Sequence, residues 1–513
     1  MGEGIINLYR EKVKVRWKIG FWVAFWACLA VHSYKFLNTL HNHDSLYNVY
    51  TNQNVVRSGR WFLQYACGIS SYFDLPWVNG LLCAVYLGLI TAVIAELFEL
   101  DNPVVIGLTG VILSACPATT ETLFFGFTAD GYFLGLLLAS LSALLSTRMD
   151  ATPVENVLSG TFLCLSLAIY QAYISFAIML CISYVVKTML DREMTVKQVW
   201  RWIARHVLLY GISAAAYYAV WKTILAFTGQ AASDNQGIAN VGQGLNLTTV
   251  FAGLLTSVRN LLFFFLEWNI LDHPITLYAV INIFFGVCFA AVVCRALVSS
   301  KAGWKMNAMI LFALILSVPL ISVWCLVSAE VSYRPMMLHS AVVYYILAMI
   351  LFDRWFNTKV STWFAGLIVI MVFNFAVMAN IAYFYMEKCE EKSYYLGSQL
   401  MEVIEDKIET NSEIEYIAFV GNRAKEVAIA QDFPGSKIHI LGEQLESDLL
   451  FDHIHSCMYL QEVFGLELPR LSVSEAKDLE TEAFVKEMSI WPAEEAVVVF
   501  DGVLVIKLAE VTE

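Results

Sequence analysis

Long apolar runs recur through the first three quarters of this 513-residue chain, and they constrain its fold more than any other feature. Stretches such as 77–97, 275–297 and 362–386 have the length of about 20 residues that an α-helix needs to cross a bilayer. Hydrophobic residues make up 58% of the chain and charged residues 15%, whereas soluble domains have roughly 45–50% and 25%. The excess apolar surface must face lipid. This excludes a cytosolic enzyme, a disordered chain and a disulfide-stapled secreted scaffold.

The same criterion identifies eleven candidate membrane-spanning segments. They are residues 19–36, 77–97, 103–117, 130–147, 156–170, 172–190, 206–227, 275–297, 306–327, 336–352 and 362–386. Two of them, 103–117 and 156–170, are short and are expected to be re-entrant or tilted. The long segments 37–76 and 228–274 are expected to be outer loops, the second with an amphipathic interfacial helix. We therefore predict a polytopic α-helical membrane domain over residues 1–386.

Basic residues predict the orientation of this domain. With a cytoplasmic N-terminus, the inner segments hold 16 Lys and Arg and the outer loops hold five, as the positive-inside rule predicts. The basic flank at 10–18 precedes a span without a small-residue cleavage site, which indicates a retained signal-anchor. An odd number of spans places the C-terminal region outside the cytoplasm, and the loss of one short span would reverse that placement.

The C-terminal region, residues 387–513, differs in composition from the rest. It carries 27 acidic and 10 basic side chains against 18 and 22 in residues 1–386, so charges of −17 and +4 make up the net −13. The β-branched runs 414–421, 436–441 and 496–508 predict strands, the last with a hairpin turn at Asp501-Gly502. Helical patterns lie near 394–408, 422–431 and 474–488. We expect a small, acidic, extracytoplasmic α/β domain.

Two classes of site are excluded by what the sequence lacks. A basic footprint for nucleic acid is absent. The 11 cysteines include no CxxC pair and lie mostly in apolar spans, so neither a disulfide framework nor a zinc site is expected.

The first outer loop concentrates side chains that can perform chemistry. It offers the carboxylate of Asp44, the imidazoles of His41 and His43, and the guanidinium groups of Arg57 and Arg60. A carboxylate can act as a general base toward a hydroxyl, and a guanidinium fork suits a phosphate. This pairing is what transfer from a phosphate to an alcohol requires. The alternatives are a solvated loop with a salt bridge, or a metal cluster at His-x-His-Asp.

Two further polar sites lie at predicted outer ends of spans. Asp130 opens a span and is either a helix cap or a second acid of the outer cavity, with Glu121 nearby. The amide and phenol of Gln171 and Tyr170 lie between two apolar runs. They either bind a sugar hydroxyl or bridge two helix ends.

Two cations near outer span ends complete the candidate residues. Lys222 either snorkels to the interface or contacts a lipid phosphate. Arg334 lies beside a helix-starting proline in a short outer loop, where it either binds a phosphate or pairs with Glu330.

The order of these motifs resembles the O-antigen glucosyltransferase II family of bacterial membrane proteins. The motifs that carry the resemblance are His43-Asp44, Ser58-Gly59-Arg60-Trp61, Asp130-Gly131-Tyr132, Tyr170-Gln171, and Trp491-Pro492 followed by VLVIKL at 503–508. The resemblance covers nearly the whole chain, and its specificity comes from the order of short motifs.

This resemblance implies a GT-C-type glycosyltransferase in the bacterial inner membrane. It implies a polyprenyl-phosphate-linked hexose, glucose by preference, as donor, and a surface polysaccharide or glycolipid as acceptor on the outer face. In such enzymes an acid of the first outer loop is usually catalytic, which corresponds here to Asp44. Many carry a second acid beside it, whereas here the neighbours are His43 and Ser45. We therefore predict a metal-independent reaction without a cofactor.

The remaining candidates take roles around that acid. Arg60, Arg334 and Lys222 are expected to hold the donor phosphate and to stabilise its charge as it leaves. The residues expected to bind substrate are His43, Asp130, Tyr170 and Gln171. A one-step displacement would invert the anomeric centre. The alternatives are a transporter or flippase of lipid-linked sugars, or an accessory protein whose tail binds a partner. The sequence specifies no oligomeric state.

Overall fold

The computed structural model describes residues 12–50, 55–233, 246–267, 276–328, 331, 333–423, 439–442, 445 and 448–511. The chain divides into two compact units. The first comprises Met1–Thr39 and Asn54–Asn380, and the second comprises Leu40–Gln53 and Ile381–Glu513. The segment Leu40–Gln53, which lies within the predicted outer loop 37–76, therefore groups with the C-terminal region.

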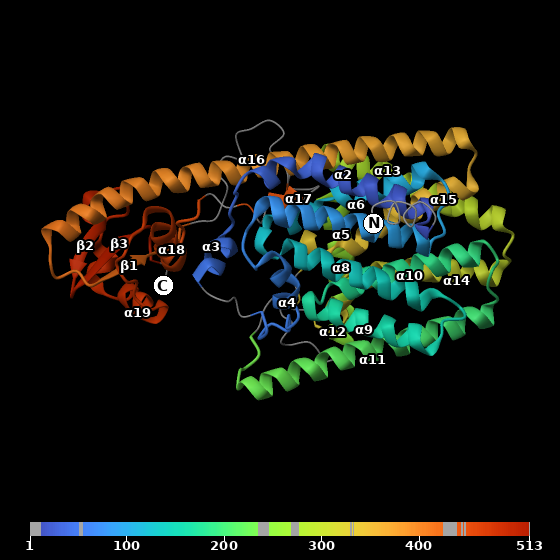
Figure 1. Ribbon diagram of the computed structural model, residues 1–513, viewed down its shortest axis with the longest axis horizontal. Coiled ribbons are helices and arrows are strands. Elements are labelled where there is room, and N and C mark those ends of the chain that lie inside the picture. The colour runs from blue at the N-terminus through green and yellow to red at the C-terminus, as the bar shows by residue number, and fades with distance from the viewer. Residues whose placement is uncertain are drawn as a thin grey trace, which may run out of the picture. The chain divides into compact units, whose positions relative to one another are not determined.

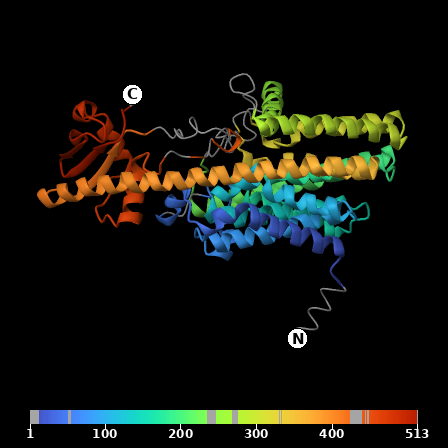
Figure 2. The ribbon, with the colours of Figure 1, turned by 90° about the horizontal axis from the view of Figure 1, so that it is seen from above.

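The first unit is a bundle of helices, and most of its long helices run along a common direction in both views (Figure 1, Figure 2). They are α2 (Val15–Leu37), α4 (Leu63–Cys67), α5 (Pro76–Leu97), α6 (Pro103–Ala115), α7 (Pro117–Phe124), α8 (Gly126–Thr147), α9 (Pro153–Ile169), α10 (Tyr173–Leu190), α11 (Val196–Thr228), α12 (Leu247–Leu266), α13 (Leu277–Ser300), α14 (Trp304–Leu320), α15 (His339–Trp355) and the start of α16 (Thr358–Thr410). Short 3-10 turns are η1 (Gly68–Ser70), η3 (Val323–Leu326) and η4 (Pro335–Met337). Each of the eleven predicted spans overlaps a helix.

The number of helices that could span a membrane differs from the predicted eleven. The described residues contain eight helices that are long and apolar enough, or nine if the bent pair α6–α7 is one span. The difference arises because α9, α14 and α15 have 17 residues each, and because α6, the first half of the bent pair, has 13. In addition, α12 lies where an interfacial helix was expected, and its 20 residues meet the criterion for a span.

Prolines decide where several of these helices begin. Pro76, Pro103 and Pro153 each occupy the first helical turn, where the missing N–H costs nothing. Pro117 breaks the α6–α7 pair, because the residue before a proline is driven to extended backbone. Cys116 has φ −61° and ψ 153°, and the two helices meet at 40°.

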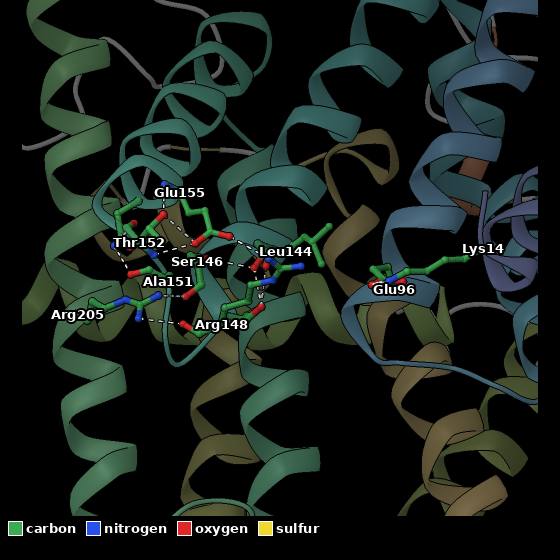
Figure 3. Close-up of polar contacts among 12 residues, drawn as sticks. Lys14, Glu96, Leu144, Ser146, Arg148, Ala151, Thr152, Glu155 and Arg205 are labelled. Atoms are coloured by element: carbon green, nitrogen blue, oxygen red, sulfur yellow. Dashed lines mark hydrogen bonds and ion pairs between the residues drawn. The ribbon is translucent and has the colours of Figure 1, made fainter. Parts of the chain in front are cut away.

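Polar contacts show which helix ends lie together. An ion pair between Lys14 and Glu96 joins the start of α2 to the end of α5. Arg205 near the start of α11 donates to the backbone carbonyl of Arg148 at 3.0 Å, just past the end of α8, and Arg148 pairs with Glu155 at 2.9 Å (Figure 3). A side-chain ion pair also joins the C-terminal ends of α10 and α15. We call the end of the bundle that these helix ends form the basic end. Its cations are Lys14, Arg16, Arg148, Arg192, Arg205 and Arg354.

The second unit contains the rest of α16, a small sheet and short helices. Its elements are α3 (His43–Tyr50), β1 (Tyr416–Val420), α17 (His439–Gly442), α18 (His453–Phe464), α19 (Val473–Glu480), α20 (Ala483–Glu487), η6 (Glu494–Ala496), β2 (Val497–Phe500) and β3 (Val503–Lys507). The strand order is β1-β3-β2, with β1 parallel and β2 antiparallel to β3.

Two of the three runs predicted to form strands in this unit do so. β1 lies within 414–421, and β2 and β3 form the hairpin of 496–508, with Asp501 and Gly502 at φ 46° and 73° as its turn requires. The strand expected at 436–441 is wrong, because its described part belongs to the helical turn α17. Both Ile440 and Leu441 are buried there at 1% exposure, so packing overrides their β-propensity. The helix expected at 422–431 lies almost wholly outside the described residues.

Leu46 ties α3 to the core of the second unit. Its side chain is 1% exposed and belongs to a cluster with Leu400 and Ile404 of α16, Ile417 of β1 and Leu460 of α18. Burial of a leucine contributes roughly 1.5–3 kcal/mol. This packing holds the adjacent His43 and Asp44 on the second unit.

Candidate functional site

The guanidinium of Arg60 lies against two tyrosines in the first unit. Its Nη1 donates to the Tyr132 hydroxyl at 3.1 Å, and its central carbon lies 4.8 Å from the centre of the Tyr170 ring. The two rings are 4.9 Å apart. Cation–π attraction and a hydroxyl acceptor therefore set the plane of the guanidinium, as recognition of a planar or tetrahedral anion requires.

Residues 56–60, which we call the Arg60 turn, are held by hydrogen bonds from side chains distant in sequence, on α11 and in the turn between α9 and α10. The Gln171 amide nitrogen donates to the Ser58 carbonyl at 2.8 Å and to the Tyr217 hydroxyl at 2.9 Å. Tyr217 donates to the Gly59 carbonyl at 3.1 Å, and the Trp221 indole donates to another carbonyl of the turn at 2.8 Å. Three side chains thus fix the backbone that carries Arg60.

Gly59 is required at its position in this turn. Its φ is +86°, and an added Cβ would collide with the Tyr217 hydroxyl and lie 2.5 Å from the Gln171 amide nitrogen. Only glycine combines this backbone conformation with so close an approach of two side chains.

Arg334 lies within electrostatic range of one of these tyrosines, Tyr170. Arg60, Glu121 and Arg334 are all within electrostatic range of the Tyr170 hydroxyl. The Glu121 carboxylate accepts the backbone N–H of Met336, which anchors η4 directly after Arg334. Two of the three predicted phosphate-binding cations are therefore within electrostatic range of one phenol, and the alternative partner Glu330 lies outside the described residues.

Lys222 has a different setting. It is exposed on α11, 5.3 Å from the Tyr218 ring centre and 5.1 Å from that of Trp221. These contacts are within its own helix, as for a lysine that lies along apolar surface with its charge toward the interface.

Asp130 is buried at 1% exposure in the second turn of α8, so it is not the cap of that helix. It lies beside Ser70 and Asn79. The Ser70 hydroxyl donates to a backbone carbonyl and the Asn79 amide to Ser70, and in the described part of the chain neither Asp130 oxygen has a hydrogen-bond partner of good geometry. Tyr132 lies two residues, or roughly 200°, further around the helix, so Asp130 and the Arg60 contact are on different faces.

Asp44 and His43 lie in the second unit with side chains from α18. His43 Nε2 is 3.7 Å from Asp44 Oδ1, and the His43 ring lies 5.9 Å from that of His455 and 6.3 Å from that of Phe451. His455 Nδ1 is 2.7 Å from a carboxylate oxygen of Asp452. The residues that the structure describes include no group of three or more His, Cys, Asp or Glu arranged to hold a metal ion.

Several of these residues were not selected from the sequence. Tyr217 and Trp221 lie one turn apart on the buried face of α11, and their polar tips were the available signal, because a buried phenol or indole needs a partner. No sequence pattern marked Asp452 and His455 as candidates, because they are of interest only for their proximity to His43 in the folded second unit.

Comparison with known proteins adds the family. The family model described as glucosyl transferase GtrII matches residues 33–352, which is more than half of the chain and contains Asp44, Arg60, Gln171 and Arg334. Comparisons with curated proteins and with solved structures found no match. The resemblance drawn from the short motifs is confirmed by this match: the chain belongs to the glucosyl transferase GtrII family.

Proposed function

We propose that this glucosyl transferase moves a hexose, glucose by preference, from a polyprenyl-phosphate donor to a surface polysaccharide or glycolipid at the outer face of the bacterial inner membrane. The observation that carries the proposal is the placement of Arg60 against Tyr132 and Tyr170, with Arg334 in electrostatic range of the same phenol. A guanidinium fixed by aromatic side chains, as that of Arg60 is, suits the phosphate of a lipid-linked donor.

The helix directions support an outer site. Tyr132 contacts Arg60, whereas Ser146 on the same helix accepts a hydrogen bond from Arg205 at the basic end. Fourteen residues of α-helix separate these contacts by about 21 Å. If the basic end is cytoplasmic, as the positive-inside rule predicts, Arg60 lies toward the outer side.

The proposed reaction assigns a role to each group. The acceptor oxygen forms a bond to the anomeric carbon as the bond from that carbon to the phosphate oxygen breaks. The proton of the acceptor hydroxyl passes to the carboxylate of Asp44. Arg60 and Arg334 stabilise the charge on the leaving polyprenyl phosphate. One displacement inverts the anomeric centre.

The proposal is tested with the purified full-length protein in nanodiscs, polyprenyl-phosphate [14C]glucose as donor and a surface-polysaccharide extract as acceptor. Asp44→Asn is expected to lower kcat at least 100-fold. Arg60→Lys is expected to raise the donor KM and lower kcat together, because a lysine does not reproduce the bidentate fork. Arg57→Ala is the matched control, since Arg57 lies in the same loop but donates to the Ala231 carbonyl at 2.9 Å instead. Wild-type turnover in both Asp44→Asn and Arg60→Lys would refute the proposal.

An experiment with the same donor distinguishes the proposed transferase from the alternative, a transporter or flippase. Such a protein would move intact labelled donor across the wall of a sealed proteoliposome and leave its sugar–phosphate bond unbroken. Free polyprenyl phosphate as a product supports transfer, whereas intact donor moved to the far leaflet supports transport.

A further inference from the structure

α18 presents a histidine held by a carboxylate. Asp452 is the N-cap of this helix, and its Oδ1 accepts the backbone N–H of His455 at 2.8 Å. The same oxygen lies 2.7 Å from Nδ1 of the His455 ring. One carboxylate therefore caps the helix and fixes the orientation of the imidazole, with Nδ1–H directed to Asp452.

The segment with Asp44 is anchored on the same unit from two sides. The backbone N–H of His41 donates to the Glu390 carboxylate of α16 at 2.9 Å, and its ring Nδ1 lies 2.7 Å from the same oxygen. Three residues after His43, Leu46 enters the core of the unit. The position of His43 relative to α18 is therefore determined by packing and pairing.

The rings of the two histidines lie edge to face within this frame. The rings of His43 and His455 are 5.9 Å apart at 69°, and Phe451 stacks on His455 at 4.3 Å. Continuing along this row, His43 Nε2 lies 3.7 Å from Asp44 Oδ1. The row runs Asp452, His455, His43, Asp44. The side chains of His455 and His43 are 13% and 21% exposed, whereas those of Asp452 and Asp44 are 29% and 39% exposed. The two imidazoles are therefore partly shielded from water, and the row opens to water at Asp44.

We propose that Asp452 and His455 of the C-terminal region are positioning residues for the catalytic carboxylate of Asp44 and act through His43. The inference rests on the proposed role of Asp44. His455, fixed by Asp452, restrains the His43 ring, and that ring restrains the Asp44 carboxylate. The C-terminal region thereby contributes to the reaction although the family match ends at residue 352.

This arrangement predicts a division between binding and turnover. The donor phosphate is assigned to Arg60 and Arg334 of the first unit, so disturbing the row should leave the donor KM within twofold. The rate of proton removal from the acceptor depends on the orientation of Asp44, so kcat should fall. A purely structural defect would reduce the amount of active protein. It would not produce the non-additive loss of kcat that the double variant below is expected to show.

Asp452→Asn is the informative variant, because asparagine is as good an N-cap as aspartate but carries no charge toward the imidazole. We expect it, and His455→Ala, to lower kcat about tenfold or more at an unchanged donor KM. His43→Ala should cause a similar loss, and the double variant H43A/H455A should lose no more than H43A alone, because both act along one row. Ser472→Ala is the matched control: it removes the N-cap of α19 in the same unit and should leave kcat unchanged.

The outcomes separate this inference from the proposed function. Wild-type kcat in Asp452→Asn and His455→Ala, together with an inactive Asp44→Asn, would overturn the positioning role alone. Full activity in Asp44→Asn would overturn the catalytic role of Asp44 and the inference with it. Multiplicative losses in the double variant, or an equal loss in Ser472→Ala, would also overturn the positioning role.

Discussion

At the scale of single residues, Gly59 offers a test of how strictly the Arg60 turn must be held. In Gly59→Ala the added methyl would meet the hydroxyl of Tyr217 and the amide of Gln171, at a φ of +86° that alanine disfavours. We expect a loss of transfer of about 100-fold, because a 1 Å displacement of a charged group at a site can cost that much. The measurement is the rate of glucose transfer from the lipid-linked donor.

The chain provides a matched control for this substitution. Gly229 has a φ of +66°, and a Cβ there would meet nothing within 4 Å. Gly229→Ala therefore carries the backbone strain without the collision and should retain activity. Equal losses in both variants would show that strain, not the position of Arg60, limits the rate.

Asp130 carries a prediction about stability. A buried carboxylate without a good hydrogen bond is costly inside a membrane protein, by about 1–3 kcal/mol for an unsatisfied group. We expect Asp130→Asn to keep or raise the thermal unfolding midpoint in detergent. Glu121→Gln is the comparison. Because Glu121 accepts the N–H of Met336, its replacement should not raise the thermal unfolding midpoint. A clear fall in the midpoint of Asp130→Asn would contradict this account.

The candidate residues could be named from the sequence more easily than their roles. Arg60, Tyr170 and Gln171 could be selected because a guanidinium, a phenol and an amide there interrupt or flank apolar runs. Gln171 illustrates the limit: a sugar contact and a bridge between helix ends were both open, and the structure shows its amide nitrogen bound to Ser58 and Tyr217. Which backbone carbonyl a side chain meets depends on contacts between residues more than 100 positions apart, which a local pattern does not contain.

At the scale of elements, α18 should make the second unit sensitive to acid. The Nδ1 of His453 accepts the N–H of Phe419 in β1 at 3.2 Å, and its Nε2–H donates to the Leu471 carbonyl at 2.9 Å. Only the neutral ring can make both bonds. Burial lowers the pKa of His453 below its ordinary 6.5. The stabilisation is therefore complete above about pH 6.5 and is lost as the pH falls below it.

Hydrogen–deuterium exchange of the β1 peptide, expressed as a protection factor, measures this effect in the full chain. Wild-type protection should fall between pH 7.5 and 5.5. His453→Asn keeps an acceptor for Phe419 without a titrating ring, so its protection should be lower at pH 7.5 but nearly independent of pH. A wild-type pH dependence that persists in this variant would assign the effect to other groups.

Helices and strands were predictable to different degrees for a physical reason. The helices follow from apolar length, which belongs to each segment alone, and each predicted span overlaps one. The bend after α6 could be anticipated from Pro117, but the ends of α9, α14 and α15 depend on neighbouring turns. The strand expected at 436–441 failed because burial of Ile440 and Leu441 in the second unit decides its conformation.

At the scale of the whole molecule, the grouping of Leu40–Gln53 with Ile381–Glu513 could not be predicted from the sequence. Composition separates the acidic region from the apolar one, but α3 has no compositional mark that assigns it to either. Its membership comes from Leu46 in the core and from pairing of His41 with Glu390. Long-range contacts of this kind explain why a carboxylate predicted from one loop acquires partners from the far end of the chain.

The orientation of the chain is the last expectation open to test. α16 begins just after α15, whose Arg354 lies at the basic end, so a span that begins there must end on the opposite side. With a cytoplasmic basic end, a membrane-impermeant maleimide applied to intact cells should label Lys222→Cys and Glu482→Cys above the background of the native cysteines. Asp150→Cys, in the exposed turn after α8, should react only after permeabilisation. Labelling of Asp150→Cys in intact cells would place the basic end outside, and Arg60 would then face the cytoplasm, where a donor presented on the outer leaflet cannot reach it.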